Sequence, residues 1–399
     1  MSHFLSNLLV IVTAIYVVGV LAFVVGLFLP TPPRRPNRRR VSVVVAARNE
    51  QHRIGNLLSD LTNQTYPEEL YEIIVVDDGS SDRTASIVRA AQAQHPNVRL
   101  LHVTETPSWM SPKKYALEQG IRAARGEIIL TTDADCRVSN AWIETVLSYF
   151  NDDVGMVVGF SQMGRPREKR SLLEKLQALD FLSLMGAAAG ACQIRFPLAG
   201  SGQNLAYRKE AFLAVGGYSQ VGHRVSGDDV LLLQLVRRQT NWKIVFAFDP
   251  RAYATTEPEK TLSALLNQRR RWASNGVYQF FLNQPFFLYA LNTFTLNLLI
   301  LLGVPAALFN GGLGLVGAAF AAKALAELTL LLRAGQLFGR LDLLRVYPLW
   351  VVLQIPYVVL VGVGGTFGNF TWKGRPHRAA ITPAALSGKE ARTQEPTEF

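Results

Sequence analysis

The feature that most restricts how this chain can fold is its first apolar segment. Residues from Phe4 to Leu29 carry no charged side chain. At about 1.5 Å per residue, a helix of this length is longer than the roughly 30 Å hydrocarbon core of a membrane. A cleaved signal peptide is the alternative, but no Lys or Arg precedes the segment and no small-x-small cleavage site follows it. The segment therefore predicts an uncleaved membrane anchor.

Basic residues after this segment predict its orientation. The run from Arg34 to Arg40 holds five arginines and no acid. Positively charged segments next to a membrane helix stay on the cytoplasmic side. We therefore expect the N-terminus outside the membrane and the chain after residue 40 in the cytoplasm.

Three further apolar segments lie towards the C-terminus, at residues 285–309, 313–332 and 348–367. The second contains Lys323 and Glu327, four residues apart on one helix face, which we expect to pair inside the helix bundle. Lining an acceptor path is the alternative role for these two residues.

The charge rule conflicts with three crossings by these segments. The loop before the last segment is predicted to be cytoplasmic because it carries Arg333, Arg340 and Arg345. The basic segment 373–378 would then lie outside, against the same rule. Either this tail is an exception, or one apolar segment is re-entrant or interfacial.

Two predicted strands end in polar turns between the first anchor and these segments. Residues 41–47 form a β-branched run followed by Arg48-Asn49-Glu50 and a helical stretch at about 53–62. Residues 73–76 form a second strand, followed by Asp77-Asp78-Gly79 and a helix to about residue 93. Strand, acidic turn and helix in this order are typical of a doubly wound sheet, whose ligands lie beyond the carboxyl ends of the strands.

A third acidic turn follows the apolar run 128–130. Residues two apart in an extended segment share a face, so Asp133 and Asp135 are expected to project together and to hold one divalent cation. Further on, Asp228 and Asp229 open an apolar helical run, and Gln268-Arg269-Arg270-Arg271-Trp272 lies on another helix. A turn, a helix cap and a membrane-surface anchor are the plain structural roles for these three motifs.

In this order and spacing, the motifs resemble those of membrane-bound family 2 glycosyltransferases, over about residues 41–275. The resemblance implies an α/β domain of the glycosyltransferase A type, with a mostly parallel central sheet flanked by transmembrane helices. It implies inverting transfer of a sugar from a nucleotide diphosphate sugar to a hydroxyl group. It also implies a divalent metal, Mn²⁺ or Mg²⁺, held by Asp133 and Asp135.

The resemblance also assigns roles to single residues. Asp229 is the implied general base, with Asp228 beside it. Residues implied to bind the nucleotide sugar are Ala47, Arg48, Glu50, Asp78, Lys113, Asp133, Gln268 and Arg271. Trp272 offers a flat face to the acceptor. The glycine-rich segment 198–204 precedes the acidic pair, so we expect an acceptor-side wall there with Asn204 as a hydrogen-bonding group; a plain loop is the alternative.

The chain departs from the family pattern at two places. Relatives carry Gly-Lys-x-Asn-Ala-Leu where this chain has Pro112-Lys113-Lys114-Tyr115-Ala116-Leu117, so Tyr115 stands at the Asn position. Asp228 stands where relatives have Glu, and its side chain is shorter by one methylene. The resemblance therefore assigns no donor-sugar contact to Tyr115.

Composition restricts the partners. The chain of 399 residues has a net charge of +11 and 49% hydrophobic residues. Its arginines lie beside apolar segments without alternating aromatic residues. This pattern favours anionic lipid headgroups as partners, and no nucleic acid.

Cys136 and Cys192 form no disulfide framework and fit a reducing compartment. His223 has no metal-ligand spacing to another His and is expected to lie in a loop.

These observations give a predicted domain order: an anchor at 1–30, a basic linker at 31–40, a catalytic domain at 41–280, a membrane region of about three apolar helices at 281–370, and a tail at 371–399 that is disordered from about Ala379. The stretch 172–191 is expected to be either an interfacial or a buried helix.

The predicted protein is a multi-pass inner-membrane enzyme, a hexosyl- or N-acetylhexosaminyltransferase with a cytoplasmic catalytic domain. We expect a UDP-sugar donor and a membrane lipid acceptor. A processive polysaccharide synthase acting on a growing glycan is one alternative, and a catalytically silent membrane scaffold is another.

Overall fold

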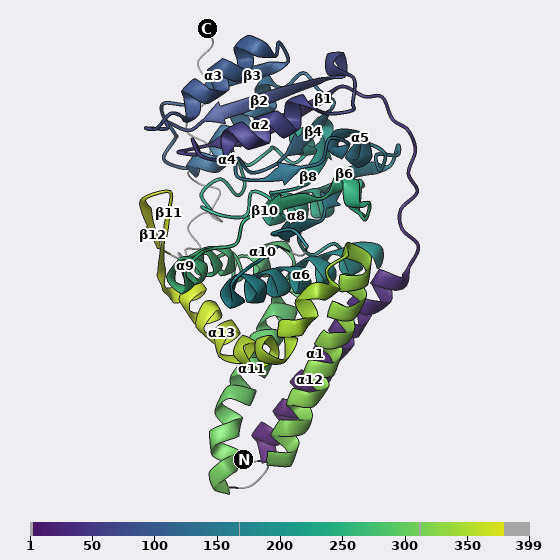
Figure 1. Cartoon of the computed structure of the whole chain (residues 1–399). Helices are drawn as coiled ribbons and strands as arrows, with labels where there is room; N and C mark the ends of the chain where they lie inside the picture. Colours follow the sequence, from purple (N-terminus) through teal and green to yellow (C-terminus); the bar gives the residue numbers. More distant parts are fainter. Residues whose placement is uncertain (1–2, 167, 311–312, 379–399) are drawn as a thin grey trace.

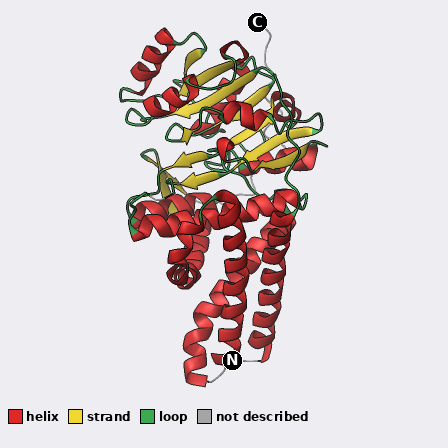
Figure 2. Cartoon of the chain, turned by 45° about the vertical axis from the view of Figure 1, so that its right-hand side comes forward, coloured by secondary structure: helices red, strands yellow, loops and turns green. Residues whose placement is uncertain are grey.

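The structure is a computed structural model that describes residues 3–166, 168–310 and 313–378. A strand-rich domain, which we call the catalytic domain after the role predicted for it, lies above an all-helical region (Figures 1 and 2). The predicted disordered tail from Ala379 lies outside the described residues.

A seven-stranded sheet forms the centre of the catalytic domain. Its strands are β1 (Val41–Ala47), β2 (Tyr71–Asp77), β3 (Val98–His102), β4 (Ile128–Thr131), β6 (Val154–Gly159), β8 (Leu205–Arg208) and β9 (Lys243–Ala247). Their order is β3-β2-β1-β4-β8-β6-β9, and only β8 runs antiparallel to its neighbours. The predicted α/β fold with a mostly parallel sheet is confirmed.

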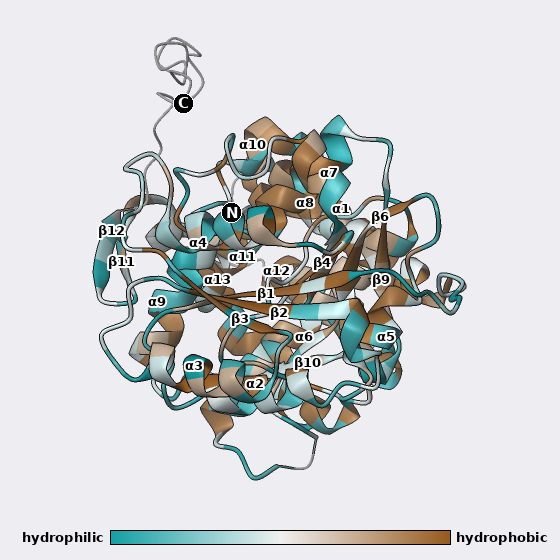
Figure 3. Ribbon diagram, turned by 90° about the horizontal axis from the view of Figure 1, so that it is seen from above, coloured by the Kyte–Doolittle hydropathy of each residue, from teal (hydrophilic) through white to brown (hydrophobic). Residues whose placement is uncertain are grey.

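Helices cover both faces of this sheet, which explains why β1 reads as a continuous apolar run. Val43 and Val45 pack with the helices of one face, and Val44 packs with those of the other. The first face carries α2 (Ile54–Thr62), α3 (Thr84–Gln94) and α5 (Trp142–Leu147). The second carries α4 (Pro112–Ala123), α7 (Lys209–Ala214) and α8 (Val230–Gln239). Figure 3 shows the hydrophobic strands running between these helices.

Smaller elements connect the sheet to the helical region. A three-stranded sheet joins β5 (Arg137–Val138), β10 (Ala254–Thr256) and β7 (Ser161–Met163). Below it lie α6 (Leu172–Gln193), α9 (Leu262–Ala273) and α10 (Gln279–Leu282). The 3₁₀ helices are η1 (Glu68–Leu70), η2 (Pro250–Ala252) and η3 (Leu341–Val346).

Four helices are long and apolar enough to cross a membrane within the described residues. Three are α1 (His3–Phe28), α11 (Gln284–Asn310) and α12 (Leu313–Phe338), and the fourth segment, Leu341–Phe367, comprises η3 and α13 (Tyr347–Phe367). The predicted pair inside the bundle is present: Lys323 Nζ lies 2.7 Å and 2.8 Å from the two Glu327 carboxylate oxygens, and one of them, Oε1, also accepts from the Tyr16 hydroxyl at 2.5 Å. The hydrogen bond from Tyr16 joins α1 to α12.

Helix α6 crosses α1 in direct backbone contact. A Cβ atom on Gly26 would lie 2.1 Å from the Gly190 oxygen, and one on Gly190 would lie 2.2 Å from the Phe23 oxygen. Only glycine fits at such a crossing. A capping box between Ser171 and Glu174 starts α6. The catalytic domain therefore rests on the anchor through α6, the helix that the sequence predicts as interfacial or buried.

Helix α13 bends beneath the catalytic domain and does not run beside α1 and α12 (Figure 1). Before it, the Arg340 guanidinium donates to the Gly164 carbonyl at 3.0 Å, next to β7. After it, β11 (Asn369–Trp372) and β12 (Arg375–Arg378) form a hairpin. The Asn267 side chain of α9 exchanges two hydrogen bonds with the Thr371 backbone, at 2.7 Å and 2.8 Å. Both ends of α13 thus contact the catalytic domain, which favours an interfacial or re-entrant segment.

The arginine linker runs along the catalytic domain. Arg34 pairs with Asp249, and Arg39 lies 3.4 Å from Glu127. Sequence reasoning attributed such arginines to lipid headgroups. At least these two also tie the linker to the domain that follows it.

The structure predicts that the linker and the C-terminal hairpin face the same side of the membrane. Single cysteines at Asn37 and Gly374, in a chain without Cys136 and Cys192, should react with a membrane-impermeant maleimide under the same conditions. A cysteine at Gly314, which has open space around it, should react only from the opposite side. Labelling of positions 374 and 314 from one side would contradict this arrangement.

Candidate active site

A cavity of about 830 Å³ lies at the carboxyl edge of the central sheet. Loops after β1, β2 and β4 form one side, and α6, α9 and the β11–β12 hairpin form the other. Its acidic lining residues are Glu50, Asp78, Asp133, Asp135, Asp228, Asp229, Glu257 and Glu259. All predicted site residues line this cavity except Asn204.

The loops after β1 and β2 are tied together. Arg48 donates to the Asp78 carbonyl at 2.6 Å and lies 3.7 Å from the Asp78 carboxylate. Asn49 has φ +54°, and its side chain accepts from the Ser81 backbone N–H at 2.9 Å. Burial raises the pKa of Asp78, and Arg48 opposes this shift. The Asp78 carboxylate thus remains a hydrogen-bond acceptor on the cavity wall. Asp78 also lines a second cavity, of about 350 Å³.

Asp133 and Asp135 line the cavity from a turn, and not from an extended segment as the sequence suggested. Strand β4 ends at Thr131, and the Cys136 N–H donates to the Asp133 carbonyl at 3.0 Å to close the turn. Burial raises the pKa of Asp135 to about 6, with further contributions from Asp133 and Glu50.

These carboxylates fit a divalent metal. Among the described residues, no group of three or more His, Cys, Asp or Glu side chains converges on one point. Mg²⁺ is commonly bound by one or two carboxylates together with substrate phosphates. Asp133 and Asp135 supply hard oxygen ligands, and a cation beside Asp135 would relieve the repulsion from Asp133 and Glu50, which adds to burial in raising its pKa. A metal held by these two carboxylates would keep coordination positions for the phosphates of a substrate.

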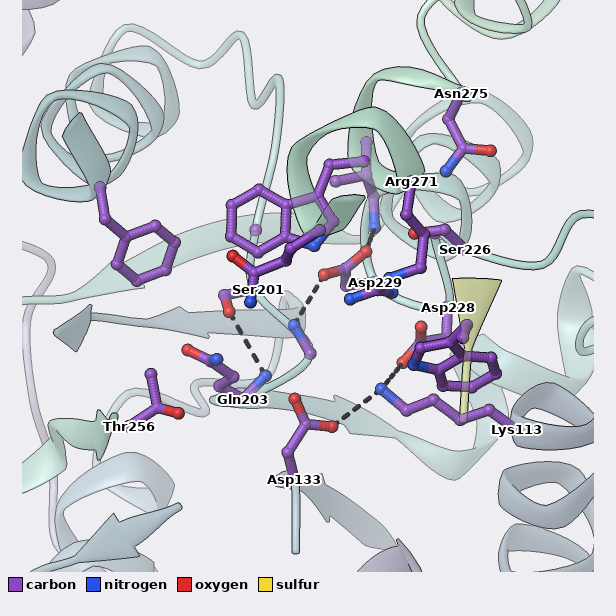
Figure 4. A pocket seen from close by; sticks show the side chains of 18 of the residues that line it. Lys113, Asp133, Ser201, Gln203, Ser226, Asp228, Asp229, Thr256, Arg271 and Asn275 are labelled. Atoms are coloured by element: carbon purple, nitrogen blue, oxygen red, sulfur yellow. Dashed lines mark hydrogen bonds and ion pairs between the residues drawn. The ribbon is translucent and has the colours of Figure 1, made fainter. Parts of the chain in front are cut away.

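Lys113 joins the two acidic groups of the site. Its Nζ lies 2.8 Å from Asp133 and 2.9 Å from Asp228, as Figure 4 shows. Burial opposes ionisation of Asp228, but Lys113 and Lys114 outweigh it and lower its pKa. Asp228 is therefore held as a carboxylate beside a fixed cation.

Asp229 has a different environment. One carboxylate oxygen accepts from the Val230 N–H at 2.6 Å and caps α8, and the other accepts from the Gly202 N–H at 2.8 Å. Burial and the neighbouring Asp228 raise the pKa of Asp229. A carboxylate with a raised pKa accepts a proton more readily, so the two neighbours differ in basicity.

Asn204 lies outside the cavity, which differs from the expectation for an acceptor contact. Its amide donates to the carbonyls of Phe160 and Ala252 at 2.9 Å and 2.7 Å and accepts from Trp142 at 3.0 Å. Asn204 is 1% exposed. Its amide is occupied within the protein, and the neighbouring Ser201 and Gln203 line the cavity.

Helix α9 presents the predicted Gln-x-x-Arg-Trp residues to the cavity. Gln268 donates to Glu259 at 3.0 Å. The Arg271 guanidinium lies 5.4 Å from the centre of the Trp372 ring, and the Arg269 guanidinium lies 4.1 Å from that of Trp272. Cation–π contacts of this kind fix the rings against the helix.

The β11–β12 hairpin contributes residues that sequence reasoning did not identify. Lys373 pairs with Glu50, and Thr371, Trp372 and Arg375 also line the cavity. The sequence offers no local signal for these contacts because they depend on the path of α13.

Two further residues considered in the sequence lie apart from these contacts. Cys136 is buried behind the turn that carries Asp133 and Asp135. His223 lies in a loop with its ring edge-on to Tyr278.

One wall of the same cavity is apolar. It is formed by side chains of α1, α6 and α11: Phe23, Phe181, Leu184, Met185, Phe286 and Tyr289. The acids and the helices of the predicted membrane region thus border one continuous space.

Comparison with known proteins agrees with this architecture. A model of the family described as glycosyl transferase family 2 matches residues 42–212, and a model of glycosyl transferase family group 2 matches residues 128–363. The mannosyltransferase PcManGT from Pyrobaculum calidifontis, solved in complex with GDP-Man and Mn²⁺, has a similar fold: the TM-score is 0.59 at 23% identity, covering 90% of this chain and 98% of that one.

Curated relatives match over the catalytic part. The β-monoglucosyldiacylglycerol synthase of Trichormus variabilis is 30% identical over 248 residues, which is 61% of this chain and 50% of that protein. The poly-β-1,6-N-acetyl-D-glucosamine synthase of Staphylococcus epidermidis is 27% identical over 249 residues, or 59% and 54%. The match therefore spans about half the length of these relatives.

The environment of Asp135 predicts metal-dependent ligand binding. Asp135→Asn should weaken binding of a nucleoside diphosphate in the presence of Mn²⁺ and leave metal-free binding near that of the parent. In the parent, Mn²⁺-dependent affinity should fall as the pH drops through about 6, because the raised pKa of Asp135 means that its carboxylate is lost there. Isothermal titration calorimetry with and without Mn²⁺ measures both effects. Equal metal dependence in parent and variant would contradict the assignment.

Proposed function

Since this chain belongs to the family 2 glycosyl transferases, we propose that it moves one sugar from a nucleoside diphosphate sugar, a UDP-sugar, to the hydroxyl group of a membrane lipid. Inversion at the anomeric carbon and action at the cytoplasmic face of the inner membrane are parts of this proposal. The donor is made in the cytoplasm, on the side where the arginine linker would stay by the charge rule.

The observation that carries the lipid acceptor is the apolar wall of the cavity. Phe23 and Met185 come from helices that cross at the Gly26–Gly190 contact, and Tyr289 comes from the next helix of the bundle. A hydroxyl group on an acyl lipid can reach the acids while its chains stay against these side chains. A sugar polymer would gain little from such a wall, because its surface carries hydroxyl groups that need hydrogen-bonding partners.

Donor binding uses the loops after β1, β2 and β4. Asp78 accepts a hydrogen bond from the N–H of a uracil ring, as an ionised carboxylate can. Asp133 and Asp135 would hold a divalent metal, which supplies charge neutralisation for the diphosphate leaving group when bound. Lys113 and the half-buried Arg271 add positive charge next to the same group.

Asp229 then acts on the acceptor. Its carboxylate takes the proton of the lipid hydroxyl while that oxygen forms a bond to the anomeric carbon. The bond from this carbon to the diphosphate oxygen breaks on the opposite face, and its electron pair leaves with the nucleoside diphosphate. One base without a partner nucleophile suits a single inverting displacement.

A processive polysaccharide synthase is the second candidate. The observation that favours it is the similarity to poly-β-1,6-N-acetyl-D-glucosamine synthases. The two functions differ in product: a lipid that gains the mass of one sugar, or a polymer that does not partition with lipids.

The lipid proposal predicts a selective effect of Leu184→Glu. Leu184 lines the cavity and is 51% exposed, so the protein should tolerate the change. Purified protein in liposomes that contain diacylglycerol should form a singly glycosylated lipid from UDP-glucose or another UDP-sugar. The variant should raise the acceptor KM about tenfold or more, because it places a charge against the acyl chains.

Leu172→Glu is the matched control for this change. Leu172 lies on the same helix with 52% exposure but outside the cavity lining. The control should keep the parent KM, and donor affinity should be equal in all three proteins. An equal effect of both substitutions would count against the apolar wall as the acceptor site, and a polymeric product would favour the second candidate.

The mechanism predicts different roles for the acidic pair. Asp229→Asn should lose about a hundred- to ten-thousand-fold in single-turnover transfer while donor affinity stays near that of the parent, because a base acts on the acceptor proton. Asp228→Asn should be milder. Transfer in the parent should also decline at low pH, where the raised pKa of Asp229 leaves it protonated. A nearly inactive Asp228→Asn beside an active Asp229→Asn would reverse the roles.

A further inference from the structure

Lys114 is a buried cation to which the mechanism above gives no role. It is 0% exposed and lies in the first turn of α4, directly after Lys113. The N-terminus of a helix carries positive partial charge, so two lysines there are unfavourable unless each has a partner. Lys113 meets two carboxylates. The hydrogen bonds of Lys114 go to backbone carbonyls.

These carbonyls belong to the segment that leads into the acidic pair. We call residues 224–227 the approach loop. Lys114 Nζ donates to the Ser226 carbonyl at 2.8 Å and also to the Arg224 carbonyl. Gly227 follows with φ +85°, and Asp228 comes next. Lys114 therefore fixes the backbone immediately before the two carboxylates.

The other side of the approach loop is attached to α9. The Arg224 side chain donates to the Asn275 side chain at 3.2 Å and to the Ser274 carbonyl, just after the end of α9. The loop thus lies between the helix that carries Lys113 and the helix that carries Arg271. A change at Lys114 would release one side of this clamp.

The ionisation of Lys114 is set by burial and neighbouring cations on one side and by two carboxylates on the other. Burial lowers its pKa to about 7, with Arg224 and Lys113 acting in the same direction and Asp228 and Asp229 acting against it. His223 also faces this group, and its pKa is lowered by burial, Arg224 and Lys114. The ammonium form is therefore present below a pH of about 7 and is lost as the pH rises through that value.

We propose that Lys114 is a positioning residue for the general base. Its ammonium group holds the approach loop and, through its charge, keeps Asp228 and Asp229 ionised next to the acceptor hydroxyl. The inference rests on the proposed role of Asp229. It adds a dependence of sugar transfer on a cation that touches neither donor nor acceptor.

The test is the pH profile of single-turnover transfer for the parent, Lys114→Arg and Lys114→Met. The parent rate should rise as Asp229 loses its proton and fall again above about pH 7. Lys114→Arg keeps a charge at all these pH values, so the fall above pH 7 should disappear. Lys114→Met should be slower at every pH, and its acid limb should move to higher pH because one stabilising cation is gone.

Donor affinity and thermal unfolding of each variant serve as controls, since the turn at Asp133 and Asp135 is not altered. An unchanged fall above pH 7 in Lys114→Arg would overturn the proposal. So would a constant loss of rate with the parent pH profile in both variants. If Lys114→Arg does not fold, the acid limb of Lys114→Met decides. Absence of a glycolipid product from the parent would instead contradict the proposed function.

Discussion

Repulsion among carboxylates that share one cavity is the constraint on which the rest of the site depends. Asp133 and Asp135 follow strand β4 of the sheet, while Asp228 and Asp229 precede helix α8. Like charges this close favour protonation unless cations lie between them. Lys113 bridges the two groups. The other cations of the cavity come from distant parts of the chain. The carboxylates are therefore neutralised only when the chain is correctly folded.

Local sequence was enough to predict the parts of the fold whose burial pattern is simple. The strand at Val41–Ala47 was predicted within its observed bounds, because a β-branched run covered on both faces has few alternatives. The order of strand, acidic turn and helix predicted a ligand site beyond the carboxyl ends of the strands, because these ends share one edge of a parallel sheet. Asn204 could not be assigned correctly, since its partners Trp142 and Ala252 are remote in sequence. The hairpin contacts were missed because a count of apolar segments does not reveal the bend of α13.

The crossing of α1 and α6 explains how one cavity can border both polar and apolar surfaces. Glycines at the contact let the two backbones approach, which brings the first membrane helix directly under the catalytic domain. Bulkier residues there would separate the helices and open the floor of the cavity. The apolar wall therefore depends on the close approach of the α1 and α6 backbones as well as on its own side chains.

The position of the β11–β12 hairpin in the chain has a consequence for biosynthesis. Lys373 and Trp372 reach the cavity only after the ribosome has made every helix of the membrane region. The catalytic domain, made earlier, therefore has an incomplete wall until α11, α12 and α13 have found their places. A newly made protein therefore completes the lining of its cavity last, when the hairpin has reached Glu50 and Arg271.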